Sequence, residues 1–373
     1  MSIDLDAHLS ELTCAEPGRH EGIPITLRID LEDVPTAVLN IRALKAFSLA
    51  PMRYPIHRVV RCAAHGGIAG IFDDLAVRSG LLAQRLDCGS LFLDGPGALV
   101  VLNGSPKTHY TSCKFTLWTD TPQRADAIEA MLLGIVGERR MREETFTIDW
   151  RFGAEGGHLT GVSFEELVDP ALLDEAYPAL NEPVLSFIER YLAAPETILI
   201  VQGPPGTGKT RFVRAILGAL SRRMSGRASV LYTADRRALE SDRIFMEFLT
   251  EEHDAFVIED ADHILASRAN GNLDMHRFLA IADGIVRAQG RKILFTTNLP
   301  NVGDIDDALL RPGRCFANVR TRALSRSEAT ALVRRICDGD GELCDSVSGR
   351  LLRSGAPTVT LAELYQLLPD RLR

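Results

Sequence analysis

The chain has 373 residues, of which 46% are hydrophobic and 25% are charged, and its formal net charge is −8. This length exceeds one ordinary hydrophobic core and predicts two or three domains. No apolar run approaches the roughly 20 residues of a transmembrane helix, so we expect no membrane span. The acidic net charge disfavours a protein that binds nucleic acid.

The N-terminal residues and the cysteines bear on the cellular compartment. Residues 1–6 lack the basic and then apolar pattern of a secretory signal. The seven cysteines are scattered along the chain, which indicates reduced thiols rather than a disulfide framework. We therefore expect a cytoplasmic protein.

Residues 1 to about 160 mix strand and helix patterns and carry no recognisable catalytic motif. A β-hairpin is predicted over residues 89–102. A strand is predicted at 113–118, a helix with one apolar side at 123–140, and a further strand at 145–150. We predict a separate N-terminal α+β domain over residues 1–160 that binds a client or partner, or supports assembly.

Strand and helix patterns alternate from residue 161 to residue 322. Five apolar stretches predict strands, at residues 197–202, 229–234, 255–260, 292–297 and 317–322. Helical stretches separate most of them, which predicts a largely parallel sheet with helices on both faces. In such sheets a ligand binds beyond the carboxyl ends of the strands. Residues 323–373 predict short helices and turns that form a small C-terminal helical lid.

A phosphate-binding loop follows the first of these strands. Its sequence, Gly-Pro-Pro-Gly-Thr-Gly-Lys-Thr, lies between an apolar strand and an amphipathic helix, which an ordinary glycine turn would not require. Glycines let backbone N–H groups approach phosphate oxygens, and the helix N-terminus adds partial positive charge. Lys209 is placed to reach the β- and γ-phosphates, and Thr210 to coordinate magnesium. The sequence predicts a P-loop NTPase fold with nucleotide bound by Gly203, Pro204, Pro205, Gly206, Thr207, Gly208, Lys209 and Thr210.

Two carboxylates follow the third predicted strand. Residues 255–258 are wholly apolar and run into Glu259 and Asp260, which is the Walker B pattern. One carboxylate orients magnesium through its water shell, and the next polarises the attacking water. The alternative is a solvated acidic loop, which the apolar strand argues against.

Three more polar residues follow the fourth predicted strand. Asn298 is placed to hydrogen-bond the attacking water or the γ-phosphate, although asparagine is also a common turn residue. Arg311 and Arg314 flank a Pro-Gly turn and suit a fork of donors aimed at phosphate. The alternative for both arginines is surface ion pairing.

Together the motifs GPPGTGKT, VIEDAD, FTTN and DDALLRPGR resemble those of the AAA family of ring ATPases, over about residues 165–373. The resemblance implies a large ATPase domain over 161–322, a lid over 323–373, and a hexameric ring that binds ATP and Mg²⁺ between subunits. It also implies that Arg311 and Arg314 enter the neighbouring subunit's site as arginine fingers. An arginine finger of this kind accelerates hydrolysis by about 10³–10⁵-fold. Within the family, the chain resembles the branch of the mitochondrial Rieske-protein translocase, which likewise has Glu-Asp where most members have Asp-Glu.

The chain departs from the family pattern in two respects that bear on function. By position, Glu259 takes the metal-side slot and Asp260 the water-side slot, where the shorter aspartate favours slower hydrolysis. Residues 235–248 lack the aromatic-hydrophobic-glycine triplet with which family members that thread unfolded chains grip them. Phe245 and Phe248 have helical spacing instead and are expected in the core.

Three functions are compatible with these features. The first is an ATP-hydrolysing ring that remodels or moves a protein client selected by residues 1–160. The second is a nucleotide-gated assembly switch or scaffold with slow hydrolysis, which the Glu259-Asp260 order favours. The third is DNA handling, which the acidic charge and the lack of an aromatic and basic stripe disfavour.

Overall fold

The computed structural model forms two compact units that divide between Arg142 and Glu143. It describes residues 55–85, 89–107, 110–141, 145–154, 158–168, 172–224, 228–250, 253–266, 277–279, 290–337, 341–353 and 356–369. The first 54 residues of the predicted N-terminal domain therefore lie outside the described residues. Within the described part of the chain, no helix has both the length and the apolar character needed to cross a bilayer.

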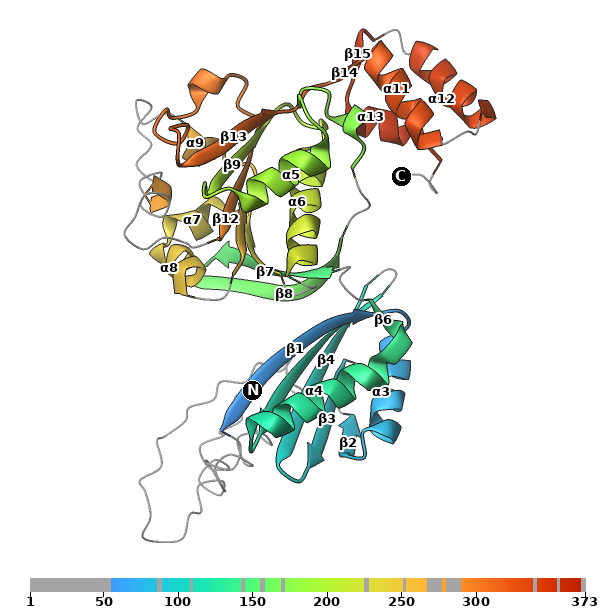
Figure 1. The fold of residues 1–373 in the computed structure, drawn as a ribbon, viewed down its shortest axis with the longest axis vertical. Coiled ribbons are helices and arrows are strands. Elements are labelled where there is room, and N and C mark those ends of the chain that lie inside the picture. The colour runs from blue at the N-terminus through green and yellow to red at the C-terminus, as the bar shows by residue number, and fades with distance from the viewer. Residues whose placement is uncertain are drawn as a thin grey trace, which may run out of the picture. The chain divides into compact units, whose positions relative to one another are not determined.

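The first unit is an antiparallel sheet with two helices on one face (Figure 1). Its strands lie in the order β2-β3-β4-β5-β1-β6. They are β1 (Ile56–Ala64), β2 (Leu82–Arg85), β3 (Ser90–Gly95), β4 (Ala98–Pro106), β5 (Thr111–Thr119) and β6 (Arg140–Met141). Helices α3 (Ile68–Arg78) and α4 (Pro122–Val136) pack on it through apolar side chains. The predicted α+β character and the β3–β4 hairpin are confirmed.

The second unit contains a seven-stranded sheet in the order β13-β9-β12-β11-β10-β7-β8. Its strands are β7 (Thr145–Gly153), β8 (Leu159–Leu167), β9 (Ile198–Gln202), β10 (Ser229–Thr233), β11 (Ala255–Ile258), β12 (Lys292–Thr297) and β13 (Cys315–Arg320). All neighbouring pairs are parallel except β7 and β8, which are antiparallel. The predicted, largely parallel sheet is confirmed.

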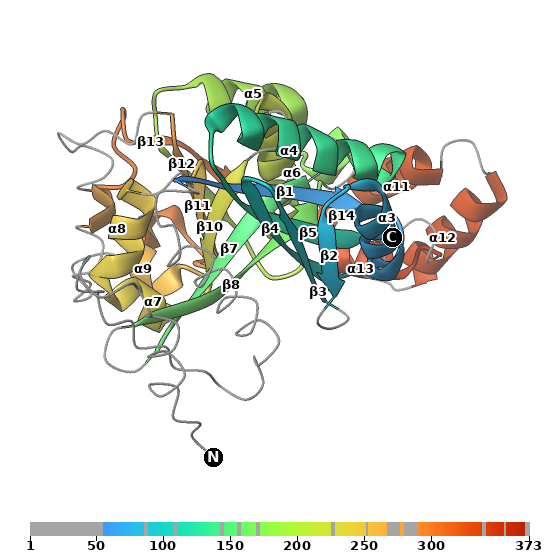
Figure 2. The ribbon, with the colours of Figure 1, turned by 90° about the horizontal axis from the view of Figure 1, so that it is seen from below.

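Helices cover both faces of this sheet because alternate strand residues point to opposite sides. Helices α5 (Val184–Ala193) and α6 (Lys209–Arg223) pack on the face that includes Leu199 and Val257. Helices α7 (Arg236–Glu240), α8 (Asp242–Thr250) and α9 (Asp262–Leu265) pack on the face that includes Phe256. Figure 2 shows α7, α8 and α9 grouped apart from α5 and α6. Phe245 and Phe248 of α8 are buried in this second core, as predicted.

The predicted domain boundary near residue 160 is wrong, because β7 and β8 belong to the second unit. Strand β7 pairs in parallel with β10, with Trp150 opposite Tyr232, and β8 forms the sheet edge beyond it. The strand at 145–150 was predicted, but strand periodicity does not specify the partner strand. The pattern also contains polar residues that are buried in the structure, Thr147 and Asp149.

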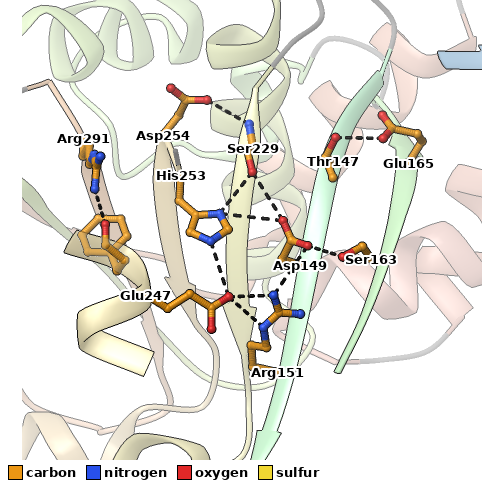
Figure 3. Close-up of polar contacts among 11 residues, drawn as sticks. Thr147, Asp149, Arg151, Ser163, Glu165, Ser229, Glu247, His253, Asp254 and Arg291 are labelled. Atoms are coloured by element: carbon orange, nitrogen blue, oxygen red, sulfur yellow. Dashed lines mark hydrogen bonds and ion pairs between the residues drawn. The ribbon is translucent and has the colours of Figure 1, made fainter. Parts of the chain in front are cut away.

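A cluster of polar side chains joins β7 to its neighbours at the amino ends of β10 and β11 (Figure 3). Asp149 accepts a hydrogen bond from Ser163 of β8 and lies 3.4 Å from the Ser229 hydroxyl and 3.7 Å from His253. Arg151 donates to Glu247 of α8 at 2.8 Å. Burial alone would raise the pKa of Glu247, but hydrogen bonds from His253 and Arg151 outweigh it and hold this pKa below its ordinary value.

Replacing Asp149 with alanine is expected to lower the free energy of unfolding of the second unit by about 3 kcal/mol. Asp149 is only 6% exposed, accepts hydrogen bonds from the Ser163 and Ser229 hydroxyls and lies 3.8 Å from Arg151, so its removal takes a buried carboxylate away from these partners. Denaturant unfolding followed by Trp150 fluorescence measures the change, in a Trp118→Phe background that removes the other tryptophan. Glu240→Ala, which breaks an exposed pair with Arg236, is the control and should cost less than about 1 kcal/mol. Equal losses in the two variants would contradict a structural role for the cluster.

The C-terminal segment of the second unit is mainly helical, as predicted for the lid. It contains α11 (Arg326–Cys337), α12 (Gly341–Arg353), α13 (Leu361–Gln366) and the short paired strands β14 (Leu324–Ser325) and β15 (Thr358–Val359). Helix α13 begins with a capping box in which the Thr360 hydroxyl accepts from the Glu363 N–H and the Glu363 carboxylate accepts from the Thr360 N–H. This cap fixes the start of a helix that reaches the site described next.

Candidate nucleotide-binding site

The predicted phosphate-binding loop connects β9 to α6, at the carboxyl edge of the sheet. Two of its glycines are required by close approach. Gly208 has a φ of +90°, and a Cβ there would lie 2.6 Å from the Leu361 side chain. A Cβ on Gly203 would lie 2.2 Å from the Thr321 carbonyl oxygen. No side chain caps the first turn of α6, so its N–H groups suit a bound phosphate.

A cavity of about 780 Å³ opens between this loop, the strand ends and helix α13. The residues that line it are Pro205, Gly206, Gly208, Lys209, Thr210, Arg211, Glu259, Asp260, Thr296, Asn298, Leu361, Ala362 and Tyr365. Backbone donors, one lysine and two carboxylates therefore face the same space. That combination suits a nucleotide with a metal-bound phosphate chain.

Lys209 lies at the back of the loop and is 8% exposed. Its Nζ donates to the carbonyl oxygens of Gly203 and Pro204 at 2.8 and 3.1 Å, and to Asn298 Oδ1 at 2.7 Å. Burial lowers the pKa of Lys209, and the neighbouring carboxylates, Asp260 first among them, act in the opposite direction. An anionic phosphate in the cavity would favour the charged ammonium in the same way.

Glu259 and Thr210 form the part of the site that fits a magnesium ion. The Thr210 hydroxyl donates to Glu259 Oε1 at 2.7 Å, and both residues line the cavity. Hydroxyl and carboxylate oxygens are the ligands that Mg²⁺ accepts, with phosphate oxygens and water completing its shell. Within the described residues, no group of three or more His, Cys, Asp or Glu could hold a metal without such help. Thr210 and Glu259 would therefore hold the ion with the nucleotide, and the ion would neutralise phosphate charge.

Asp260 and Asn298 lie together beside Lys209. Asn298 Nδ2 donates to Asp260 Oδ1 at 3.0 Å, and the Asn298 backbone N–H donates to Asp262 at 2.8 Å. Asp260 has a φ of +49°, a left-handed conformation that is uncommon outside glycine. Its backbone N–H donates to the Thr296 hydroxyl at 3.1 Å. These contacts hold the Asp260 carboxylate at the exposed face of the cavity, where a water could reach it.

The structure thus brings most of the predicted site residues together. Three residues of the loop support it from behind rather than line the cavity. Gly203 and Pro204 supply carbonyl oxygens for Lys209, and the buried Thr207 hydroxyl donates to the Pro204 carbonyl at 2.7 Å.

Neither predicted finger arginine lines the cavity of its own chain. Arg311 is exposed, and its carbonyl oxygen accepts from the backbone N–H of Arg314 at 3.2 Å. Arg314 is half-buried, and its Nη1 donates to the Ala308 carbonyl at 2.7 Å. The contact of Arg314 stabilises the turn that presents Arg311.

The sequence motifs did not identify the contribution of α13 to the site. The Ala362 backbone N–H donates to the Gly206 carbonyl at 3.0 Å, and Arg211 stacks over the Tyr365 ring at 4.3 Å. The Thr360-x-x-Glu363 capping box could have located this helix, because it marks a helix start in the sequence. It could not have shown that the helix packs against a loop more than 150 residues earlier.

A family model described as "ATPase family associated with various cellular activities (AAA)" matches residues 199–322. Residues 199–322 therefore form an AAA domain. The matched residues run from β9 to just beyond β13 and include the loop, Glu259, Asp260, Asn298 and both finger arginines.

Curated proteins are similar to parts of the chain. An ATP-dependent zinc metalloprotease FtsH of Acidothermus cellulolyticus is 29% identical over 68% of this chain and 38% of its own length. An AAA ATPase forming ring-shaped complexes of Bifidobacterium dentium is 24% identical over 52% of this chain and 40% of its own. A mitochondrial chaperone BCS1 of Danio rerio is 28% identical over 36% of this chain and 34% of its own. The chain therefore spans well under half the length of each of these relatives.

Proposed function

We propose that this chain binds and hydrolyses ATP in a ring of identical subunits and couples hydrolysis to remodelling or moving a protein client. The observation that carries the proposal is the convergence of Lys209, Thr210, Glu259, Asp260 and Asn298 on one cavity beneath a phosphate-binding loop. Together with the AAA match over residues 199–322, this arrangement supports nucleotide chemistry rather than a purely structural role.

Each residue has a role that follows from its position. Lys209 binds the β- and γ-phosphates, and Thr210 with Glu259 holds the magnesium ion. Asp260 accepts a proton from the attacking water, and Asn298 orients that water or the γ-phosphate. The hydrogen bond from Asn298 to Asp260 aligns the two groups before the nucleotide arrives.

The ring is proposed from the two arginines. Arg311 and Arg314 follow the Walker motifs in the chain but do not line their own cavity, which supports a role in a neighbour's site. One relative is named as forming ring-shaped complexes. We propose a hexamer, in which each nucleotide lies at the contact between two subunits.

The client is proposed to be a protein that binds through the N-terminal unit. The relatives include a chaperone and an ATP-dependent protease, whose names both indicate protein substrates. Of the activities that these names indicate, we propose only the ATP-dependent step for this chain. We place this activity in the cytoplasm.

Replacing Asp260 with asparagine is expected to leave ATP binding intact and to lower hydrolysis by at least about 100-fold. Asparagine keeps the shape of the side chain but does not accept a proton. Gel filtration measures the ATP that stays bound to the protein, and a steady-state assay measures the loss of hydrolysis. Sedimentation measures whether the ring is assembled. Asp307→Asn, an exposed aspartate outside the cavity, is the matched control. Unchanged hydrolysis in Asp260→Asn would refute the assigned role.

A nucleotide-gated assembly switch with slow hydrolysis is the second candidate. The observation in its favour is the short Asp260 side chain in the water-side slot, already engaged by Asn298. Turnover measured beside sedimentation, with and without ATP, separates the two functions. Fast turnover stimulated by a client supports the remodelling machine, whereas ATP-dependent assembly with negligible turnover supports the switch.

A further inference from the structure

We propose that Tyr232 is a positioning residue that fixes Glu259 in the metal-side slot of the site. The inference rests on the proposed function, because Glu259 matters only if the site binds magnesium with ATP. The Tyr232 hydroxyl donates to Glu259 Oε2 at 2.8 Å. The other carboxylate oxygen, Oε1, accepts from Thr210 at 2.7 Å. Both oxygens of Glu259 are therefore held by hydroxyl donors on different elements.

These two hydrogen bonds compensate for the extra length of the Glu259 side chain. A glutamate has one more rotatable bond than the aspartate usual at this position in the family, so it has more conformers to lose when it is ordered. Hydrogen bonds to both oxygens select one of those conformers before the metal arrives. Preorganisation of this kind strengthens binding because less freedom is lost on binding.

The Tyr232 ring is itself fixed by strand β7. Trp150 lies opposite Tyr232 in the parallel pairing of β7 and β10. The two rings meet edge to face, with centroids 5.3 Å apart and planes at 87°. Trp150 also packs on Phe152, at 4.9 Å between centroids. The strand that follows the N-terminal unit in the chain thus supports the residue that holds Glu259.

The surroundings of Tyr232 favour the protonated form of its hydroxyl, which is the form that donates to Glu259. Burial, and next the charge of Glu259, raises the pKa of Tyr232 above its ordinary value. Tyr232 is not among the residues that line the nucleotide cavity, so it would act through Glu259.

Tyr232→Phe tests the proposal, because it removes one hydroxyl and keeps the ring against Trp150. Mn²⁺ is the probe, with its binding measured by electron paramagnetic resonance in the presence of a non-hydrolysable ATP analogue. The Mn²⁺ affinity is expected to fall about tenfold, as for the loss of a hydrogen bond to a charged group. Affinity for the analogue without metal should stay within twofold. Excess Mg²⁺ should restore most of the hydrolysis.

Two controls make the result specific. Tyr191→Phe removes another buried tyrosine hydroxyl, one that donates to the Thr197 carbonyl at 2.9 Å outside the site, and should leave Mn²⁺ binding unchanged. In a Glu259→Ala background, Tyr232→Phe should have no further effect. A Mn²⁺ affinity in Tyr232→Phe within twofold of the wild type would overturn the proposal, as would an equal loss in the Glu259→Ala background. Because these readouts measure binding, a wild-type protein that binds Mn²⁺ and analogue but never hydrolyses ATP would refute the proposed function alone.

Discussion

Lys209→Ala is expected to weaken ATP binding by at least about 100-fold and so to abolish hydrolysis at millimolar ATP or below. The lysine is nearly buried, and its ammonium lies at the back of a loop whose glycines leave room for phosphate oxygens. Removing it takes away the single cation among the residues of the predicted phosphate-binding loop. Equilibrium binding of a fluorescent ATP analogue measures the effect directly.

The same substitution also removes three hydrogen bonds that hold the loop in the absence of nucleotide. Thermal unfolding of Lys209→Ala must therefore be compared with the wild type. Thr210→Ala provides a second comparison, since it should impair Mg²⁺-dependent binding while metal-free binding persists. Wild-type affinity for ATP in a folded Lys209→Ala protein would refute the assignment of the site.

Arg311→Ala is expected to lower the rate of hydrolysis by about 10³-fold while ATP binding is retained. Arg311 is exposed at the end of a turn and absent from its own cavity. A guanidinium that acts in the adjoining subunit would stabilise charge only in the transition state, so the rate should fall and affinity should not. Arg314→Ala should reduce both hydrolysis and stability, because Arg314 also bonds to the Ala308 carbonyl.

Mixing two inactive variants tests whether the arginine acts between subunits. Arg311→Ala subunits keep an intact phosphate loop, and Lys209→Ala subunits keep an intact finger. In a mixed ring, Arg311 of a Lys209→Ala subunit can enter the site of a neighbouring Arg311→Ala subunit and complete it. The mixture should therefore regain hydrolysis that neither variant shows alone. A mixture no more active than the sum of its parts would argue for fingers that act within one chain, or for no ring.

The core of the site could be predicted from sequence because its residues follow local rules. The phosphate loop needs glycines at fixed positions, and Glu259, Asp260 and Asn298 each follow an apolar parallel strand whose carboxyl end must face the ligand. The strands themselves were predictable for the same reason, since buried parallel strands are continuously apolar. The present structure places these residues around one cavity, as the sequence predicts.

The parts that could not be predicted depend on contacts between distant segments. Tyr232 lies in a strand, and nothing near it in the sequence shows that its hydroxyl meets Glu259. Strand β7 was assigned to the wrong domain because the buried Asp149 is satisfied by residues of β8 and β10 and by His253. Leu361, Ala362 and Tyr365 reach the cavity only because α13 packs against the loop.

The position of β7 and β8 also determines where the ATPase part can be cut from the whole. A fragment that starts at residue 161 would lose β7 and part of β8, and the free side of β10 would expose unpaired N–H and carbonyl groups to solvent. Such an edge invites pairing with another molecule and aggregation. A soluble truncated protein must therefore begin before Thr145.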